Sequence, residues 1–163
     1  MKDLTDDSVF DNTIYFFSAA SKLALETEIS WENRFNRPIY QGYGLTETSP
    51  FATYVPRGKY YPGSIGIPVA NVTIAITDEM HQQVPVNTVG EIAIKGPNVM
   101  LGYYNKPELT NQVLIDGWFY SGDVGMYDEN GLLYIVDRIK DMVIVKGENV
   151  YPSEVENIIL ELP

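Results

Sequence analysis

The sequence predicts a mixed α/β protein, in which the end of a parallel sheet with one β-α-β unit is followed by an antiparallel, barrel-like subdomain and by the start of a small C-terminal domain. Three observations predict this order. Two short apolar runs near the N-terminus flank a glycine-free helical segment, short alternating runs separated by glycine and proline follow Pro50, and a strand and a helix follow residue 141. We therefore expect residues 1–138 to form one body and residues 139–163 to begin a second domain.

The composition is that of a globular protein and excludes several functional classes. Of 163 residues, 45% are hydrophobic and 20% are charged, so the chain can bury a core. The formal net charge of −11 argues against nucleic acid or an anionic membrane as a partner. The absence of cysteine excludes disulfides, thiolate zinc sites and thiol nucleophiles. No apolar run approaches the roughly 20 residues of a membrane span, so we expect a cytoplasmic protein without an integral membrane segment.

The N-terminal third of the chain predicts the β-α-β unit. Thr13–Phe17 is a short aromatic and β-branched run typical of a buried strand, and Ile39–Tyr43 is a second one. Between them, the segment Ser21–Phe35 predicts a helix that Ser21 can cap and that ends before Pro38. Strands joined in this way are usually parallel, and ligands gather where such strands end.

The middle of the chain predicts a small antiparallel sheet. Between two of its strands, Asn130-Gly131 forms the tip of a hairpin turn. A short helix is expected from Pro107 to about Ile115. The strands are expected at residues 72–77, 91–95, 118–120, 124–127 and 132–137. In the C-terminal part we expect a strand at Met142–Lys146 and a helix at Pro152–Leu162.

The segment Gln41–Glu47 at the end of the second parallel strand has the residue types of a nucleotide site. Gly42 and Gly44 flank Tyr43 and allow a flat ligand to approach its ring. Thr46 can donate a hydrogen bond to a phosphate oxygen, and the Glu47 carboxylate suits a Mg²⁺ ion that nucleotide phosphates also hold. From the residues alone, a glycine-rich turn with a solvated glutamate is the more frequent explanation of such a segment.

Two further charged residues are candidates for contacts with a nucleotide. Asp123, within Tyr120-Ser-Gly-Asp123, can accept hydrogen bonds from the two hydroxyls of a ribose, although an aspartate after glycine also suits a turn. Arg138 offers donors to ribose or phosphate oxygens, and a plain interdomain salt bridge explains it equally well. His81 is the only histidine, which argues against a catalytic triad or a histidine metal site.

The order and wording of six segments closely resemble one family, the adenylate-forming enzymes, which comprise acyl- and aryl-CoA ligases, firefly-type luciferases and peptide-synthetase adenylation domains. The match runs from about Phe17 to the end of the chain. The segments are FSAASKL (17–23), QGYGLTETS (41–49), GSIGIPV (63–69), GEIAIKGPNVMLGYYNKPELT (90–110), DGWFYSGDVG (116–125) and DRIKDMVIVKGENVYPSEVE (137–156).

This resemblance implies an enzyme that activates a carboxylic acid with ATP and Mg²⁺ as an acyl-adenylate and then transfers the acyl group to coenzyme A. The chain would be a fragment of such an acid-thiol ligase, acting on a fatty or aryl acid. Residues 1–138 would form the C-terminal part of the large AMP-binding domain, and residues 139–163 the hinge and the beginning of the small mobile domain.

The resemblance also assigns residues to the nucleotide. Tyr43 would stack on adenine and, with Gln41, the loop residues Ala20 and Ser21 would line the base pocket. Thr46 would contact the α-phosphate, Glu47 would bind Mg²⁺, and Asp123 with Arg138 would hold the ribose. The nucleotide site as a whole would comprise Ala20, Ser21, Gln41, Gly42, Tyr43, Gly44, Thr46, Asp123 and Arg138. Its central expectation is that Tyr43, Glu47 and Asp123 converge around one mononucleotide.

The hinge and the thiol site are implied in the same way. Lys140 falls at the hinge, and Lys146, Gly147 and Glu148 lie in the loop that closes over the coenzyme A tunnel. The family's phosphate loop and its C-terminal catalytic lysine have no counterpart in the chain, so we expect the fragment itself to be inactive. A non-catalytic nucleotide-binding module and a protein-interaction module derived from the same family remain as alternatives.

Overall fold

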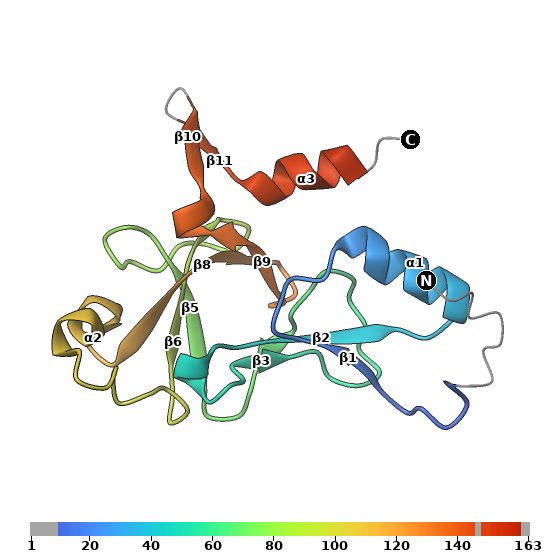
Figure 1. Cartoon of the computed structure of the whole chain (residues 1–163), viewed down its shortest axis with the longest axis horizontal. Helices are drawn as coiled ribbons and strands as arrows, with labels where there is room; N and C mark the ends of the chain where they lie inside the picture. Colours follow the sequence, from blue (N-terminus) through green and yellow to red (C-terminus); the bar gives the residue numbers. More distant parts are fainter. Residues whose placement is uncertain (1–9, 146–147, 161–163) are drawn as a thin grey trace.

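The computed structural model describes residues 10–145 and 148–160, which form two larger sheets, a separate two-stranded sheet and three α-helices (Figure 1). One sheet has the strand order β1-β2-β3-β4, and the other has the order β5-β6-β8-β7 with β9 also paired to β8. Helix α1 lies beside the first sheet, and α2 lies at the far end of the second (Figure 1). The predicted mixed α/β class is confirmed.

The β-α-β unit is present, with boundaries that differ from those predicted. It consists of β1 (Phe16–Ser18), α1 (Leu25–Phe35) and β2 (Ile39–Tyr43), and β1 and β2 pair in parallel. The helix begins four residues later than predicted, because Ala20 has a left-handed backbone (φ 75) and Ala24 is extended. The predicted cap Ser21 therefore lies in the loop before the helix, where it is free to line a cavity.

The face of α1 that packs on the sheet is aromatic and acidic. Leu25 and Ile29 are 45% and 41% exposed, whereas Trp31 and Phe35 form an aromatic cluster with Phe10, which also packs on β1. The residue one turn before Trp31 is Glu28, which is 1% exposed. The helix thus turns a carboxylate, not an aliphatic side chain, toward the sheet.

Two short strands that the sequence did not predict complete the first sheet. They are β3 (Thr53–Tyr54) and β4 (Ile67–Pro68), each antiparallel to its neighbour. Between β2 and β3 the chain turns back so tightly that a Cβ atom on Gly44 would lie 1.7 Å from the carbonyl oxygen of Pro50. Packing alone therefore requires glycine at this position.

The second sheet is antiparallel, as predicted, and contains the hydrophobic core. Its strands are β5 (Thr73–Thr77), β6 (Gly90–Lys95), β7 (Leu114–Ile115), β8 (Trp118–Tyr127) and β9 (Leu133–Arg138). Alternate apolar side chains of these strands join one core cluster, and Ala75 and Ala93 on the opposite face are buried as well. The buried members of the cluster include Ile74, Ile76, Ile92, Ile94, Phe119 and Leu133.

Two predictions for this sheet need correction. The runs at 118–120 and 124–127 belong to one strand, β8, so Asp123 lies inside a strand and not between two strands. Helix α2 (Pro107–Val113) is shorter than predicted, because Leu114 and Ile115 leave the helix to pair with β8. The predicted hairpin turn at Asn130-Gly131 is confirmed by a left-handed Gly131 (φ 75) whose N–H donates to the Asp128 carbonyl.

The C-terminal part leaves the body after a short 3-10 helix, η3 (Ile139–Asp141). Strands β10 (Val143–Val145) and β11 (Glu148–Val150) form a hairpin, of which only the first strand was predicted. Helix α3 (Pro152–Leu160) follows, and the last residues of its predicted range lie outside the described ones. Figure 1 shows this hairpin standing away from both sheets while α3 runs back past β9. The division of the chain at residue 138 stays a prediction.

Within the described part of the chain, no helix has the length and apolar character that crossing a bilayer requires.

Candidate functional site

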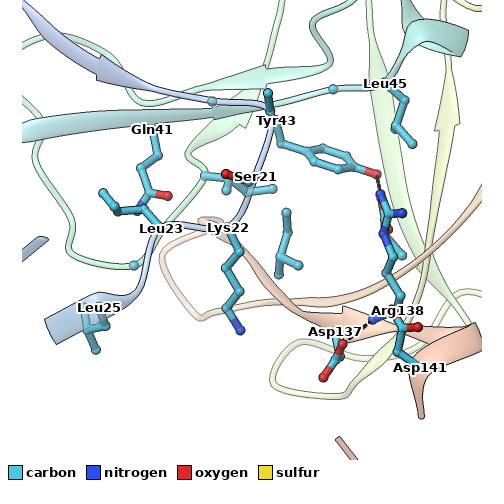
Figure 2. Close-up of a pocket in the computed structure, with 17 residues that line it drawn as sticks. Ser21, Lys22, Leu23, Leu25, Gln41, Tyr43, Leu45, Asp137, Arg138 and Asp141 are labelled. Carbon is cyan, nitrogen blue, oxygen red and sulfur yellow. Dashed lines mark hydrogen bonds and ion pairs between the residues drawn. The ribbon is translucent and has the colours of Figure 1, made fainter. Parts of the chain in front are cut away.

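The described structure has a cavity of about 270 Å³ at the carboxyl end of β2, which we call the first cavity. Its walls come from the loop before α1, from β2, and from the end of β9 with η3 (Figure 2). Parallel strands end here, so the position is the one predicted for a ligand. The predicted residues that line it are Ala20, Ser21, Gln41, Gly42, Tyr43, Gly44, Asp123 and Arg138.

Tyr43, Asp123 and Arg138 are joined by two short contacts in the wall of the first cavity. The Tyr43 hydroxyl donates to Asp123 Oδ2 at 2.6 Å, and Arg138 Nε forms an ion pair with Asp123 Oδ1 at 2.8 Å (Figure 2). Tyr43 and Asp123 are buried, whereas Arg138 is about half exposed. Burial raises the pKa of Tyr43, and the negative charge of Asp123 raises it further. The phenol is therefore a stable donor that fixes the carboxylate.

A bulge in β8 sets the direction of Asp123. Ser121, Gly122 and Asp123 together stand opposite the single residue Ile92 of β6. The Ser121 hydroxyl donates to the Ile92 carbonyl at 2.7 Å, and the Gly122 N–H donates to the carboxylate of Glu91 at 2.8 Å. Gly122 has φ 72, a left-handed conformation that favours glycine.

Glu91 was not recognised as a site residue from the sequence. Burial raises the pKa of its carboxyl, while the hydrogen bond from Gly122 acts in the opposite direction. Glu91 lies in a strand whose sequence alternates in the ordinary way, so nothing in the sequence indicates its contact with Gly122. That contact depends on the bulge in the neighbouring strand.

The Gln41 side chain is hydrogen-bonded to a buried carboxylate of α1. Its Nε2 donates to Glu28 Oε2 at 2.8 Å, and the N–H of Gly63 donates to the same oxygen at 2.9 Å. Burial raises the pKa of Glu28, which these hydrogen bonds oppose. The sequence analysis did not single out Glu28. A signal was available, because residues 28, 31 and 35 share one helical face and the other two are aromatic.

A second, more open cavity adjoins the first and shares Leu45, Asp123 and Arg138 with it. Glu47 and Lys140, both predicted site residues, line this second cavity together with Glu91. The three side chains of the central expectation are thus placed as follows: the Tyr43 ring and Asp123 face the first cavity, and Glu47 and Asp123 face the second. They lie around two adjoining cavities.

Glu47 is oriented by a tyrosine that the sequence analysis did not select. The Tyr103 hydroxyl donates to Glu47 Oε1 at 2.8 Å, and the N–H of Met100 donates to the Glu47 carbonyl at 2.8 Å. Burial raises the pKa of Tyr103, and its hydrogen bond to Glu47 adds to this rise. Tyr103 is 56 residues from Glu47 in sequence, so local patterning could not reveal the pair.

The short helix that carries Glu47 is closed by its own hydroxyl residue. In η2 (Thr46–Thr48), the buried Thr48 accepts a hydrogen bond from the N–H of Leu45 at 2.9 Å. Asn98 adds hydrogen bonds to the carbonyls of Thr48 and Phe51, at 3.0 and 2.8 Å. Glu47 therefore has a fixed backbone although its side chain is only half-buried.

Four predicted site residues lie away from the two cavities or beyond description. Thr46 is exposed at the start of η2, outside both cavities. Lys146 and Gly147 lie outside the described residues. Glu148 pairs with Val145 through the backbone of the hairpin.

The donor set suits Mg²⁺ only in combination with a ligand. The described residues contain no group of three or more histidine, cysteine, aspartate or glutamate side chains placed to bind a metal ion. Mg²⁺ is commonly held by one or two carboxylates together with substrate phosphates and water. The single carboxylate of Glu47 at the edge of an open cavity matches that pattern.

Comparison with protein families and curated sequences identifies relatives for most of the chain. The model of the family "AMP-binding enzyme" matches residues 6–104. A long-chain-fatty-acid–CoA ligase from Yersinia pestis is 45% identical over 130 residues, and a feruloyl-CoA synthase from Amycolatopsis is 45% identical over 125 residues. These alignments cover 79% and 76% of this chain but 23% and 26% of the relatives. The chain thus spans about a quarter of the length of the curated relatives it matches.

Solved structures agree with these relatives. ATP-bound MatB from Rhodopseudomonas palustris superposes with a TM-score of 0.88 at 38% identity, and apo MatB superposes with a TM-score of 0.77. Both alignments cover 91% of this chain and 30% of MatB. The anthranilate CoA ligase AuaEII in complex with anthranoyl-AMP superposes with a TM-score of 0.83 at 27% identity, covering 90% of this chain and 28% of that protein.

Proposed function

The chain belongs to the AMP-binding enzyme family, and on that premise we propose that it supplies the nucleotide site of an ATP-dependent acyl-CoA ligase. This acid-thiol ligase would convert a carboxylic acid to an acyl-adenylate and then to a coenzyme A thioester. One observation carries the proposal: Tyr43 and Asp123 are hydrogen-bonded in the wall of a cavity at the carboxyl end of β2. Glu47 faces the adjoining second cavity.

The first cavity is proposed to hold the nucleoside. The Tyr43 ring offers an apolar face for stacking on adenine, beside Gln41 and the loop residues Ala20 and Ser21. Each oxygen of Asp123 already accepts one contact, from Tyr43 or from Arg138. A carboxylate has about four lone-pair sites, so Asp123 retains capacity for two ribose hydroxyls.

The second cavity is proposed to hold the phosphates. Arg138 and Lys140 bring positive charge to it, and Glu47 would bind Mg²⁺. When bound, Mg²⁺ would neutralise charge on the phosphates. The proposed role of Tyr103 is to hold the Glu47 carboxylate toward that position before the nucleotide arrives. Thr46, exposed at the start of η2, would reach an α-phosphate from the solvent side.

The C-terminal part is proposed to act as the mobile domain, with Lys140 at its hinge. In support, η3 is a single exposed 3-10 turn between β9 and the hairpin of β10 and β11. The higher TM-score with the ATP-bound form of MatB than with its apo form is consistent with a nucleotide-binding arrangement. Lys146, Gly147 and Glu148 are proposed to contact coenzyme A.

The acid is proposed only by class, as a fatty or aryl carboxylic acid. The relatives at 45% identity are named for a long-chain fatty acid in one case and for feruloyl-CoA in the other. Relatives at the same identity to this chain are thus named for an aliphatic acid in one case and for an aromatic acid in the other. Pyrophosphate release by the whole protein with a panel of carboxylic acids would identify the acid, and we expect no release from the 163-residue chain alone.

Calorimetric titration of the 163-residue chain with a non-hydrolysable acyl-adenylate mimic, such as an acyl sulfamoyl adenosine, tests the nucleotide site. Asp123→Ala should reduce affinity by about tenfold or more, since it removes a charged acceptor for the ribose. Glu129→Ala removes an exposed carboxylate from the hairpin between β8 and β9 and should leave affinity unchanged. Absence of binding by the unmodified chain would contradict the proposal and favour a protein-interaction module.

A further inference from the structure

Glu28 is a buried carboxylate whose burial packing alone does not explain. It is 1% exposed, and its environment raises the pKa of its carboxyl. Burying a charged group is unfavourable unless its hydrogen bonds compensate. A glutamine would fill the same volume without a charge, so the position is best explained by a need for a group that only accepts hydrogen bonds.

One carboxylate oxygen of Glu28 accepts hydrogen bonds from two segments that line the first cavity. Oε2 accepts from Gln41 Nε2 in β2 and from the N–H of Gly63 in the loop between β3 and β4. Both Gln41 and Gly63 line the first cavity, whereas Glu28 does not. Glu28 therefore lies outside the first cavity and affects it only through Gln41 and Gly63.

The acceptor at Glu28 determines which end of the Gln41 amide faces the cavity. An ionised carboxylate has no hydrogen to donate, so the amide must turn its NH₂ group toward Glu28. The amide oxygen then points to the other side. Figure 2 shows this oxygen on the side of Ser21, across the cavity from Arg138.

We propose that Glu28 is a positioning residue for base selection, because its buried carboxylate locks the Gln41 amide with the oxygen toward the first cavity. This inference rests on the proposed nucleotide function. The locked oxygen accepts a hydrogen bond from the exocyclic amino group of adenine. Hypoxanthine has a carbonyl oxygen in place of that amino group, so two acceptors would face each other and the base would be rejected.

Glu28→Met is the substitution that separates positioning from packing. Methionine is similar in length but has no strong acceptor, so the Gln41 amide can then adopt either orientation. Glutamine would not serve, because the N–H of Gly63 would hold its amide oxygen in the place of Oε2. Glu26→Met is the matched control, because Glu26 lies in the same first turn of α1 and is exposed.

The test compares AMP with IMP binding to the 163-residue chain by NMR titration. We expect the unmodified chain to prefer AMP by about tenfold, and Glu28→Met to prefer it by about twofold or less. Glu26→Met should retain the preference of the unmodified chain. An unchanged ratio in Glu28→Met would overturn the positioning role while leaving the proposed function intact, whereas failure of the unmodified chain to bind either nucleotide would overturn both.

A second measurement tests the geometry without any nucleotide. The side-chain amide protons of Gln41, assigned by their loss in Gln41→Met, should exchange slowly with solvent in the unmodified chain and in Glu26→Met. Fast exchange in the unmodified chain would overturn the inference whatever the AMP to IMP ratio. Slow exchange together with a ratio that collapses in Glu28→Met would support it, because a merely structural role would not change base preference.

Discussion

The two acids that shape the first cavity, Asp123 in its wall and Glu28 outside it, are almost fully buried, whereas in the second cavity Glu47 is half-buried and Lys140 is exposed. Each buried acid accepts two hydrogen bonds or ion pairs from the body of the protein. Glu47 has one side-chain donor, Tyr103.

This difference indicates two kinds of binding surface. The walls of the first cavity are part of the folded core, so a ligand meets a shape that is already formed. Glu47 and Lys140 of the second cavity make fewer contacts with the body of the protein, so little of the fold depends on them. The comparison predicts that substitutions at the first cavity change stability and binding together, whereas substitutions at the second change binding alone.

The largest effect on stability is expected from Asp123→Ala. The substitution leaves the Tyr43 hydroxyl buried without an acceptor and removes the partner of Arg138, so the free energy of unfolding should fall by about 3 kcal/mol. Urea unfolding followed by tryptophan fluorescence measures this. Glu47→Ala should cost less than about 1 kcal/mol, and equal losses for the two variants would contradict the comparison.

An intermediate effect with a characteristic pH dependence is expected from Glu28→Gln. Burial raises the Glu28 pKa above the ordinary value of 4.5, so the folded state binds the proton more tightly than the unfolded state. The stabilising contribution of this proton is present below the unfolded pKa and is lost as the pH rises through the folded pKa. Tyr60 and Glu32 are the other titratable groups near it, and Glu32 adds to the rise.

Urea unfolding of both proteins from about pH 4 to about pH 7 checks the sign. The stability of Glu28→Gln relative to the unmodified protein should improve as the pH rises, because the variant has no carboxyl to ionise. A difference that is constant over this range, or that moves the other way, would show that Glu28 is not held with a raised pKa.

The buried bonds of the first cavity could not be predicted in detail, although the position of the site could. Apolar runs and a helical segment between them predict parallel strands, and the motif Gln41–Glu47 follows directly on the second strand. The convergence of Tyr43, Asp123 and Arg138 on the first cavity agrees with that prediction. Their roles toward a nucleotide stay a prediction.

The missed residues share a physical reason. Tyr103 reaches Glu47, and Glu91 reaches Gly122, through contacts between segments far apart in sequence. Propensity and periodicity describe each segment by itself and carry no information on such pairs. Strand β8 was predicted as two runs, 118–120 and 124–127, because glycine in a bulge and glycine in a turn have the same local pattern.

A small effect on stability is expected from Tyr103→Phe. It removes one hydrogen bond to a half-buried carboxylate and should cost about 0.5–1 kcal/mol. If Tyr103 orients Glu47 as proposed, the affinity of the variant for the acyl-adenylate mimic in the absence of Mg²⁺ should equal that of the unmodified chain. Its affinity for ATP in the presence of Mg²⁺ should fall about threefold. A stability loss as large as that of Asp123→Ala would place Glu47 in the core and erase the distinction between the cavities.

The smallest effect is expected from Lys140→Ala. Lys140 is exposed in η3, so the free energy of unfolding should change by less than about 0.5 kcal/mol. The same urea experiment measures it. A larger loss would mean that the hinge region contributes to the folded body, and the proposed boundary after residue 138 would then have to move.

Because of the bulge in β8, the face to which the Asp123 side chain points depends on the number of residues in this part of the strand. Successive side chains of a strand point to opposite faces, so deleting Tyr120 would turn the Asp123 carboxylate to the other face if Phe119 kept its pairing with Ile94 of β6. Chain-length changes in this short stretch should therefore be tolerated only in pairs. The exposed residues 104–106 before α2 carry no such parity, and changes in length are expected to be tolerated there instead.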